Sequence, residues 1–329
     1  MSTLDEIRKK LQALDNKTSN KSKNSGDKVT YPHWNMPDGA SSTIRFLPDG
    51  NTENTFFWVE KQMIKLPFSG IKGHDEHKQV EVQVPCMEMY GETCPILTEV
   101  RPMWKDPSLE ATARTYWKKR SFIFQGFVKS NAVADDETPE NPIRKFVITP
   151  QIFPLIKSAL LDPELENLPT DAMLGLDFIL TKGSKGGYAD YTTSKWARKE
   201  SALTDDQLAA IEKFGLPNLA DYLPKKPTPE ACAALLDMFN ASLDGELYDP
   251  AAWAKFYKPY GFDSADSSSV ASAKPSAAPA DDVSDAIPFE TTPVSTPTPT
   301  PTATATATAT AGKSPQDILA MLRNRPKSE

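Results

Sequence analysis

The chain has little cysteine and little histidine, and this scarcity limits the chemistry that it can carry. Its three cysteines, Cys86, Cys94 and Cys232, are too few and too unevenly spaced for a disulfide framework. Its three histidines leave few candidates for acid–base catalysis, and the sequence contains no nucleophile elbow. We therefore predict a protein that is not an enzyme, with a metal-dependent nuclease as the least poor enzymatic alternative.

Long apolar runs are also missing. The sequence has no stretch of about 18 apolar residues, and its N-terminus has no apolar signal core, so we expect a cytosolic protein without membrane contact. Large apolar groups almost disappear beyond Phe262, where Ser, Ala, Pro, Asp and Thr dominate. Because such a composition cannot bury enough apolar surface to fold, residues 262–329 are predicted to form a disordered, acidic and Thr/Pro/Ala-rich tail.

Acidic residues are abundant overall, with a formal net charge of −7, but one stretch lacks them. Residues 111–131, ATARTYWKKRSFIFQGFVKSN, contain neither Asp nor Glu. Their cations are interspersed with aromatic side chains. Proteins that bind single strands without sequence preference use cations to neutralise phosphates and aromatic rings to stack on bases. The residues of this stretch that we predict to contact single-stranded nucleic acid are Arg114, Tyr116, Trp117, Lys118, Lys119, Arg120 and Phe122.

A second stretch of the same kind spans residues 181–199, TKGSKGGYADYTTSKWARK. Its glycines let the backbone approach a ligand closely. Basic residues on strand edges also prevent aggregation, and aromatic residues usually fill cores, so a structural interpretation competes with the functional one. The residues of this stretch predicted to contact DNA are Lys182, Lys185, Tyr188, Tyr191, Lys195, Trp196 and Arg198.

Short runs of β-type residues indicate a mainly β protein with some helix. The predicted strands span 44–47, 56–66, 80–84, 121–128, 145–148 and 176–181. One helix is expected to start at Thr149, and later helices are expected to be capped by Thr204 and by Thr228. Within the strand 121–128, alternation places Phe122 and Phe124 on one face and Phe127 on the other. A helix between barrel strands is common in OB-folds, which are partly open barrels that bind oligonucleotides.

The chain therefore divides into four predicted parts. Residues 1–30 form an amphipathic helix and a basic arm, and residues 31–200 form an OB-fold core with a Cys/His-containing insertion at 67–105. Residues 201–261 form a helical flank, and 262–329 form the disordered tail.

Two imidazoles and two thiols fall within residues 74–94. His74, His77, Cys86 and Cys94 are enough for one tetrahedral zinc ion, which would be structural because no open catalytic position is suggested. Their spacing differs from a tight Cys-x-x-Cys knuckle, since Leu97 stands where a further ligand would be needed. Exposed histidines and two small buried thiols are the alternative.

The order of these parts resembles the single-stranded DNA-binding proteins of T-even-type bacteriophages. The resemblance covers residues 1–200 and rests on the basic arm, on TIRFLPDGN at 43–51, on CPIL at 94–97, on YWKKRS at 116–121 and on GLDFILTKGSKGGYADYTTSKW at 175–196. It implies an OB-fold with a zinc-bearing subdomain that cooperatively coats and protects single-stranded DNA during phage replication, recombination and repair. The cytoplasm of the infected bacterial host is the location that follows.

The resemblance also assigns roles to particular segments. It implies self-association along DNA through the N-terminal arm, and recruitment of replication and recombination proteins by the acidic tail. Phe122, Tyr188 and Tyr191 occupy positions of aromatic groups in the family's binding cleft. The family's last zinc cysteine falls at Leu97 and its histidine near Met63, which leaves His74 and His77 as candidates for relocated ligands.

The tail contains DDVSDAIPFE at 281–290, which looks like the acidic Ile-Pro-Phe tip by which bacterial single-strand binders capture partner proteins. An apolar pocket with a basic rim would fit such a segment. A second functional class therefore stays open, a replication or recombination adaptor that acts mainly by protein docking through its tail.

Overall fold

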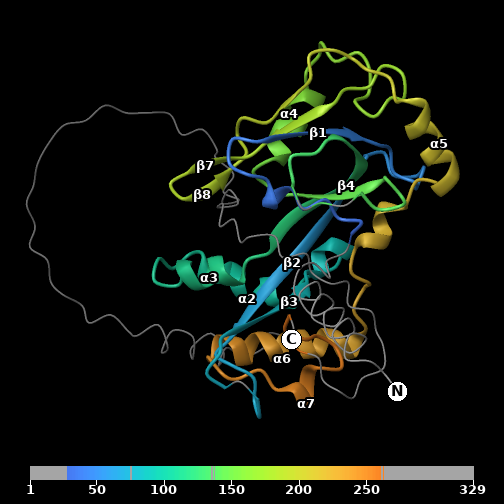
Figure 1. The fold of residues 1–329 in the computed structure, drawn as a ribbon. Helices are drawn as coiled ribbons and strands as arrows, with labels where there is room; N and C mark the ends of the chain where they lie inside the picture. Colours follow the sequence, from blue (N-terminus) through green and yellow to red (C-terminus); the bar gives the residue numbers. More distant parts are fainter. Residues whose placement is uncertain (1–27, 75, 135, 137, 261, 263–329) are drawn as a thin grey trace, which may run out of the picture.

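The computed structural model describes residues 28–74, 76–134, 136, 138–260 and 262 (Figure 1). The predicted N-terminal helix and most of the basic arm lie outside these residues. So does the predicted tail, apart from Phe262.

Seven strands form one antiparallel sheet. They are β1 (Ser41–Phe46), β2 (Val59–Phe68), β3 (Val80–Pro85), β4 (Lys119–Ser130), β5 (Arg144–Ile148), β6 (Phe178–Thr181) and β9 (Lys195–Trp196). A separate antiparallel hairpin consists of β7 (Gly183–Lys185) and β8 (Tyr188–Asp190). All six predicted strands are present, whereas the short strands β7, β8 and β9 were not predicted.

The long strand β4 organises the sheet (Figure 1). Its first half lies between β2 and β5, since Phe122 is paired with both Glu60 and Ile148. Its second half pairs with β1, where Gly126 lies opposite Phe46. A Cβ atom on Gly126 would lie only 2.2 Å from the carbonyl oxygen of Arg45, so the close approach of β1 requires glycine there.

The strand order is β3-β2-β4-β1-β6-β9, with β5 pairing β4 off this path. Within the described residues these pairings form no closed sheet, so they do not show the predicted OB barrel. What they show is a mixed α/β fold built on an antiparallel sheet. β2 joins the edge strand β3 to β4, because it pairs with β4 over Val59–Met63 and with β3 over Met63–Phe68.

The helices are α2 (Pro95–Met103), α3 (Glu110–Tyr116), α4 (Phe153–Leu160), α5 (Asp205–Phe214), α6 (Pro229–Leu243) and α7 (Pro250–Trp253). Three 3₁₀ turns complete the set, η1 (His33–Asn35), η2 (Met87–Tyr90) and η3 (Leu219–Tyr222). None of the described helices is both long enough and apolar enough to cross a membrane.

The predicted caps of α5 and α6 are confirmed. The Thr204 hydroxyl accepts from the amide of Gln207, whose side chain in turn accepts from the Thr204 amide. The Thr228 hydroxyl caps α6 by accepting from the amide of Ala231. α4 begins later than predicted, at Phe153. The Thr149 carbonyl accepts from the amides of Ile152 and Phe153 in a preceding turn, and Pro154 lies in the first helical turn.

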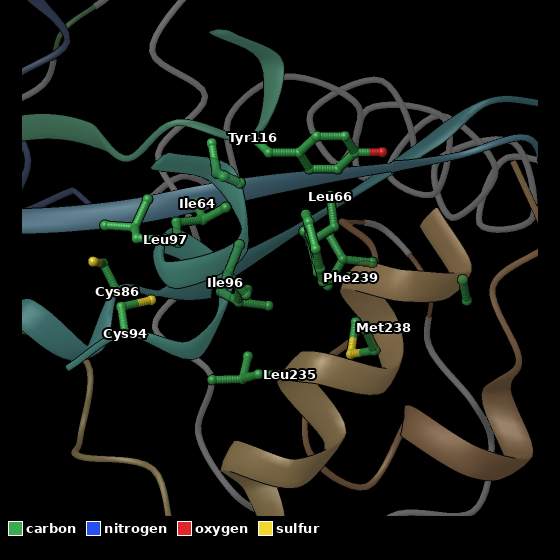
Figure 2. Packing of buried hydrophobic residues seen from close by; sticks show 14 of the residues in the cluster. Ile64, Leu66, Cys86, Cys94, Ile96, Leu97, Tyr116, Leu235, Met238 and Phe239 are labelled. Atoms are coloured by element: carbon green, nitrogen blue, oxygen red, sulfur yellow. The ribbon is translucent and has the colours of Figure 1, made fainter. Parts of the chain in front are cut away.

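Buried side chains form two large hydrophobic clusters. The first lies between the sheet and α4 and contains, among others, Phe46, Phe122, Phe124, Phe146, Ile156 and Phe178. Figure 2 shows the second, in which Ile64 and Leu66 of β2 pack against Ile96 and Leu97 of α2 and Phe239 of α6. The helix α6, predicted as a flank to a barrel, therefore completes the core of the insertion.

A third, smaller cluster lies on the other side of β4 and includes Phe127 and Leu203. Because Phe122 and Phe124 belong to the first cluster, the predicted alternation along β4 is confirmed.

Candidate nucleic-acid interface

The predicted phosphate ligands on β4 and just before it form an ordered ion-pair network. The Lys118 ammonium lies 2.8 Å from Glu88 Oε2 and donates to Gln62 Oε1 at 3.1 Å. Arg120 donates from Nε and Nη2 to the two carboxylate oxygens of Glu60, at 2.6 and 3.1 Å. These cations are therefore held by carboxylates from other parts of the chain.

Glu88 receives a second cation, the guanidinium of Arg101. Partial burial raises the pKa of Glu88, but the hydrogen bonds from Lys118 and Arg101 outweigh it and lower the pKa below its ordinary value. Glu88 is thus ionised at neutral pH. The strip formed by Arg101, Lys118, Arg120 and the two glutamates carries three positive and two negative charges. It is a weakly positive surface, called here the β4 strip.

The remaining cations of the first stretch are also engaged. Arg114 pairs with Glu110 one turn earlier in α3, at 2.9 Å. The Lys119 ammonium donates to the carbonyl oxygen of Arg114 at 3.4 Å. Both groups lie at the partly exposed surface and remain within reach of an added ligand.

Three of the predicted stacking rings are buried, and the structure corrects their assignment. Tyr116 is 5% exposed, packs its ring edge-on against Phe239 at 5.1 Å and shares a hydrogen bond of 3.0 Å with Ser242. Phe122 is 3% exposed and stacks on Phe153, with ring centroids 3.5 Å apart. Tyr191 is 1% exposed. Rings enclosed in this way have no open face for a base.

The two predicted tryptophans are half-buried. Trp117 meets Trp104 edge-on at 5.5 Å, beside the second hydrophobic cluster. Trp196 packs against Phe178 at 5.2 Å and Phe46 at 5.9 Å in the first cluster. Their main contacts are therefore with the protein core.

The second stretch keeps its cations exposed, with the exception of Lys182. The β7–β8 hairpin turns through Gly186 and Gly187, whose φ angles of +62° and +84° favour glycine. The hairpin leaves Lys185 in solvent and Tyr188 75% exposed. In Figure 1, β7, β8 and α3 extend toward the same side of the drawing.

Lys195 and Arg198 are exposed as well. Among the described residues, none of Lys185, Lys195 and Arg198 lies within 4.0 Å of a carboxylate oxygen, so none of them forms an ion pair there. Hydrogen bonds from Thr192 lower the pKa of the Asp190 carboxyl, and the charge of Lys185 adds to this effect.

Lys182 has a different role from the one predicted. Its ammonium donates to the carbonyl oxygens of Trp34 and Met36, at 2.8 and 2.9 Å. It thereby fixes the η1 turn against β1 and β6, and its charge is the least available of the second stretch.

Sequence reasoning missed an exposed aromatic pair in the loop between β1 and β2. Phe56 is 57% exposed, and its ring lies 4.7 Å from that of the half-buried Trp58, at an interplanar angle of 33°. The signal was present as three consecutive aromatic residues, 56–58, but these were attributed to a strand. In the structure β2 starts only at Val59.

The four predicted zinc ligands do not come together. His74 and His77 are exposed in the turn between β2 and β3, whereas Cys86 follows the opposite end of β3. At about 3.3 Å per residue, the strand separates the two ends by roughly 20 Å. Within the described part of the chain, no three His, Cys, Asp or Glu side chains gather as a metal site would need.

Cys86 and Cys94 are fully buried beside Leu97 in the second cluster (Figure 2). A hydrogen bond between the two thiols lowers the pKa of Cys94 and raises that of Cys86. These surroundings match the alternative of exposed histidines and buried thiols. The set of His74, His77, Cys86 and Cys94 does not fit one zinc ion in this conformation.

No protein-family model matches the chain, and no curated protein matches it either. The site is therefore assessed from its own geometry. Three features suit a ligand that carries phosphates and unpaired bases. They are the exposed cations of the second stretch, the β4 strip and the Phe56–Trp58 pair.

Proposed function

We propose that the protein binds and coats single-stranded DNA without catalysing a reaction. The observation that carries this proposal is that Lys185, Lys195 and Arg198 are exposed and form no ion pair within the described residues, while the exposed ring of Tyr188 lies opposite Lys185 in the β7–β8 hairpin. In a chain of net charge −7, exposed cations without an ion-pair partner are the groups that attract a polyanion.

The finer parts of the proposal follow the resemblance to the phage proteins. The antiparallel sheet would correspond to an OB-type core, and coating would serve phage replication, recombination and repair in the host cytoplasm. We also propose that the protein self-associates through residues 1–30 and docks partner proteins through residues 262–329. Nearly all of these residues lie outside the described part of the chain. The proposed DNA binding does not depend on a zinc ion.

The ion pairs of the β4 strip suit reversible binding. A phosphate that approaches Lys118 or Arg120 exchanges one anionic partner for another, so the cations are already extended and ordered before DNA arrives. The carboxylates of Glu88 and Glu60 then become competitors of DNA. Such competition weakens affinity and eases release, which suits a protein that must be displaced from its strand.

The test is titration with oligo-dT at several salt concentrations, followed by tryptophan fluorescence. Replacement of Lys185 and Arg198 by Ala should lower the slope of log affinity against log salt by about 1 to 2, since about one counterion is released per phosphate contact. The matched control replaces the distant exposed cations Lys213 and Lys255 by Ala and should leave the slope unchanged. A wild-type protein without salt-sensitive binding would overturn the proposal.

Two other classes are distinguished in the same preparation. An adaptor would lose its principal activity when 262–329 are removed, whereas a coating protein would retain or strengthen DNA binding. A nuclease would shorten the oligonucleotide in the presence of Mg²⁺ during prolonged incubation, which a coating protein does not do.

A further inference from the structure

The loop between β1 and β2 presents an aromatic surface that the two basic stretches do not include. Phe56 has the most exposed phenylalanine ring in the described part of the chain, and it lies on the ring of Trp58. The two rings together offer an aromatic surface that a flat ligand can contact.

The pair is backed by a continuous row of rings that reaches the core. Trp58 lies 5.5 Å from Phe153 of α4 and 5.6 Å from Phe124 of β4. Phe153 in turn stacks on Phe122 at 3.5 Å. Because Phe122 and Phe124 are buried, the row cannot shift easily, and Trp58 holds a fixed orientation.

Hydrogen bonds hold the loop in place around the pair. The Asn54 side chain donates to the carbonyl oxygen of Trp58 at 3.2 Å and to Asp49 at 2.7 Å. It also accepts from the amide of Phe56 at 3.0 Å. The exposed ring therefore stands on an ordered backbone, and a ligand that stacks on it loses little loop entropy.

Cations lie at the far end of the row and along α4. The Arg120 guanidinium lies over the Phe122 ring, 5.4 Å from its centroid. Lys157 is exposed one turn beyond Phe153 on the same helix. α4 also contacts β9, which carries Lys195 and Trp196, so the row touches elements of both basic stretches.

We propose that Phe56 and Trp58 form a stacking site for an unpaired base of single-stranded DNA. The inference rests on the proposed function and adds to it the residues that take the bases. It replaces the buried rings of Tyr116, Phe122 and Tyr191, which have no open face. Phe56 supplies the stacking face, and Trp58 positions that face against α4.

The test compares variants of the full chain in oligo-dT binding at fixed salt. Phe56→Ala should weaken affinity by about 5- to 150-fold, the range measured when one base loses its aromatic partner. The salt slope should stay unchanged because no charge is removed. Phe56→Trp should retain the affinity, and Tyr260→Ala, which removes another ring that is 67% exposed, should have no effect.

A second measurement locates the contact directly. Oligo-dT that carries 5-iododeoxyuridine should crosslink under ultraviolet light to a peptide that contains Phe56 or Trp58. If wild-type protein binds no oligo-dT, the proposed function fails. If it binds but Phe56→Ala has wild-type affinity and no crosslink forms in 55–59, only the stacking site is overturned. The site is also overturned if Phe56→Ala abolishes a DNA-free dimer in sedimentation, because the ring then covers a second copy.

Discussion

Removal of the carboxylates that hold the β4 strip should strengthen DNA binding. The perturbation is Glu60→Gln together with Glu88→Gln, which keeps the size and most hydrogen-bonding capacity of both side chains. In the wild-type protein these carboxylates lie 2.6 Å from Arg120 and 2.8 Å from Lys118. A phosphate must displace them before it can take their place, and the glutamine amides would compete far less.

The magnitude follows from the exposure of the pairs. Their side chains are between one fifth and two fifths exposed, so solvent screens them, and each pair is worth about 0 to 1 kcal/mol. If DNA regains this energy, the double variant binds up to about 30-fold more tightly. The slope of log affinity against log salt becomes steeper by about 1 to 2, because Lys118 and Arg120 are then no longer neutralised by these two carboxylates when DNA binds.

The assay is oligo-dT titration across a salt series, with the double variant Glu140→Gln and Glu230→Gln as the charge-matched control. Glu140 pairs with Lys213 and Glu230 with Lys255, and all four side chains are exposed, so this control removes two negative charges without changing the ion pairs of Lys118 or Arg120. Equal effects of the two changes would mean that net charge alone acts. Weaker binding by the double variant, or a slope equal to wild type, would refute a phosphate role for the β4 strip.

Three further predictions concern the scaffold. Asp177→Ala should lower the free energy of unfolding in urea by about 3 to 5 kcal/mol, because the fully buried Arg45 loses the carboxylate that lies 2.7 Å from its Nε. A loss below about 1 kcal/mol would contradict this prediction. Tyr116→Ala should lower the free energy of unfolding by about 3 kcal/mol and leave the slope of log DNA affinity against log salt unchanged. A lower slope would mean that Tyr116 belongs to the DNA interface. Burial lowers the pKa of His33 to about 4, so the unfolded chain binds its proton first as pH falls below 6.5, and stability should decline between pH 6.5 and 4. Denaturation midpoints of His33→Phe should lack this component.

The sequence alone determined those features that depend on neighbouring residues. Alternation along β4 assigned Phe122 and Phe127 to opposite faces, because successive side chains of a strand point to opposite sides. The caps at Thr204 and Thr228 were equally readable, since each closes on a residue three positions away. The six longer strands followed from the same local patterns.

Tertiary packing decided which of the predicted site residues reach solvent. Tyr116 and Tyr188 look alike in their basic stretches, but α6 covers the first and a glycine turn exposes the second. The apolar residues of α2 recur at helical spacing, at positions 96, 97, 100 and 103, but this period does not identify β2 and α6, on which their burial depends.

Long-range pairing also decided the chemistry of the candidate sites. Glu60 pairs with Arg120 across 60 residues of sequence, and Glu88 pairs with Lys118 across 30 residues. No local sequence pattern predicts such partners. The strand β3 separates two histidines from two cysteines that stand close in sequence. Short-range geometry thus determined strands, caps and faces, whereas exposure, charge pairing and ligand convergence depended on contacts between distant segments, which a single sequence does not specify.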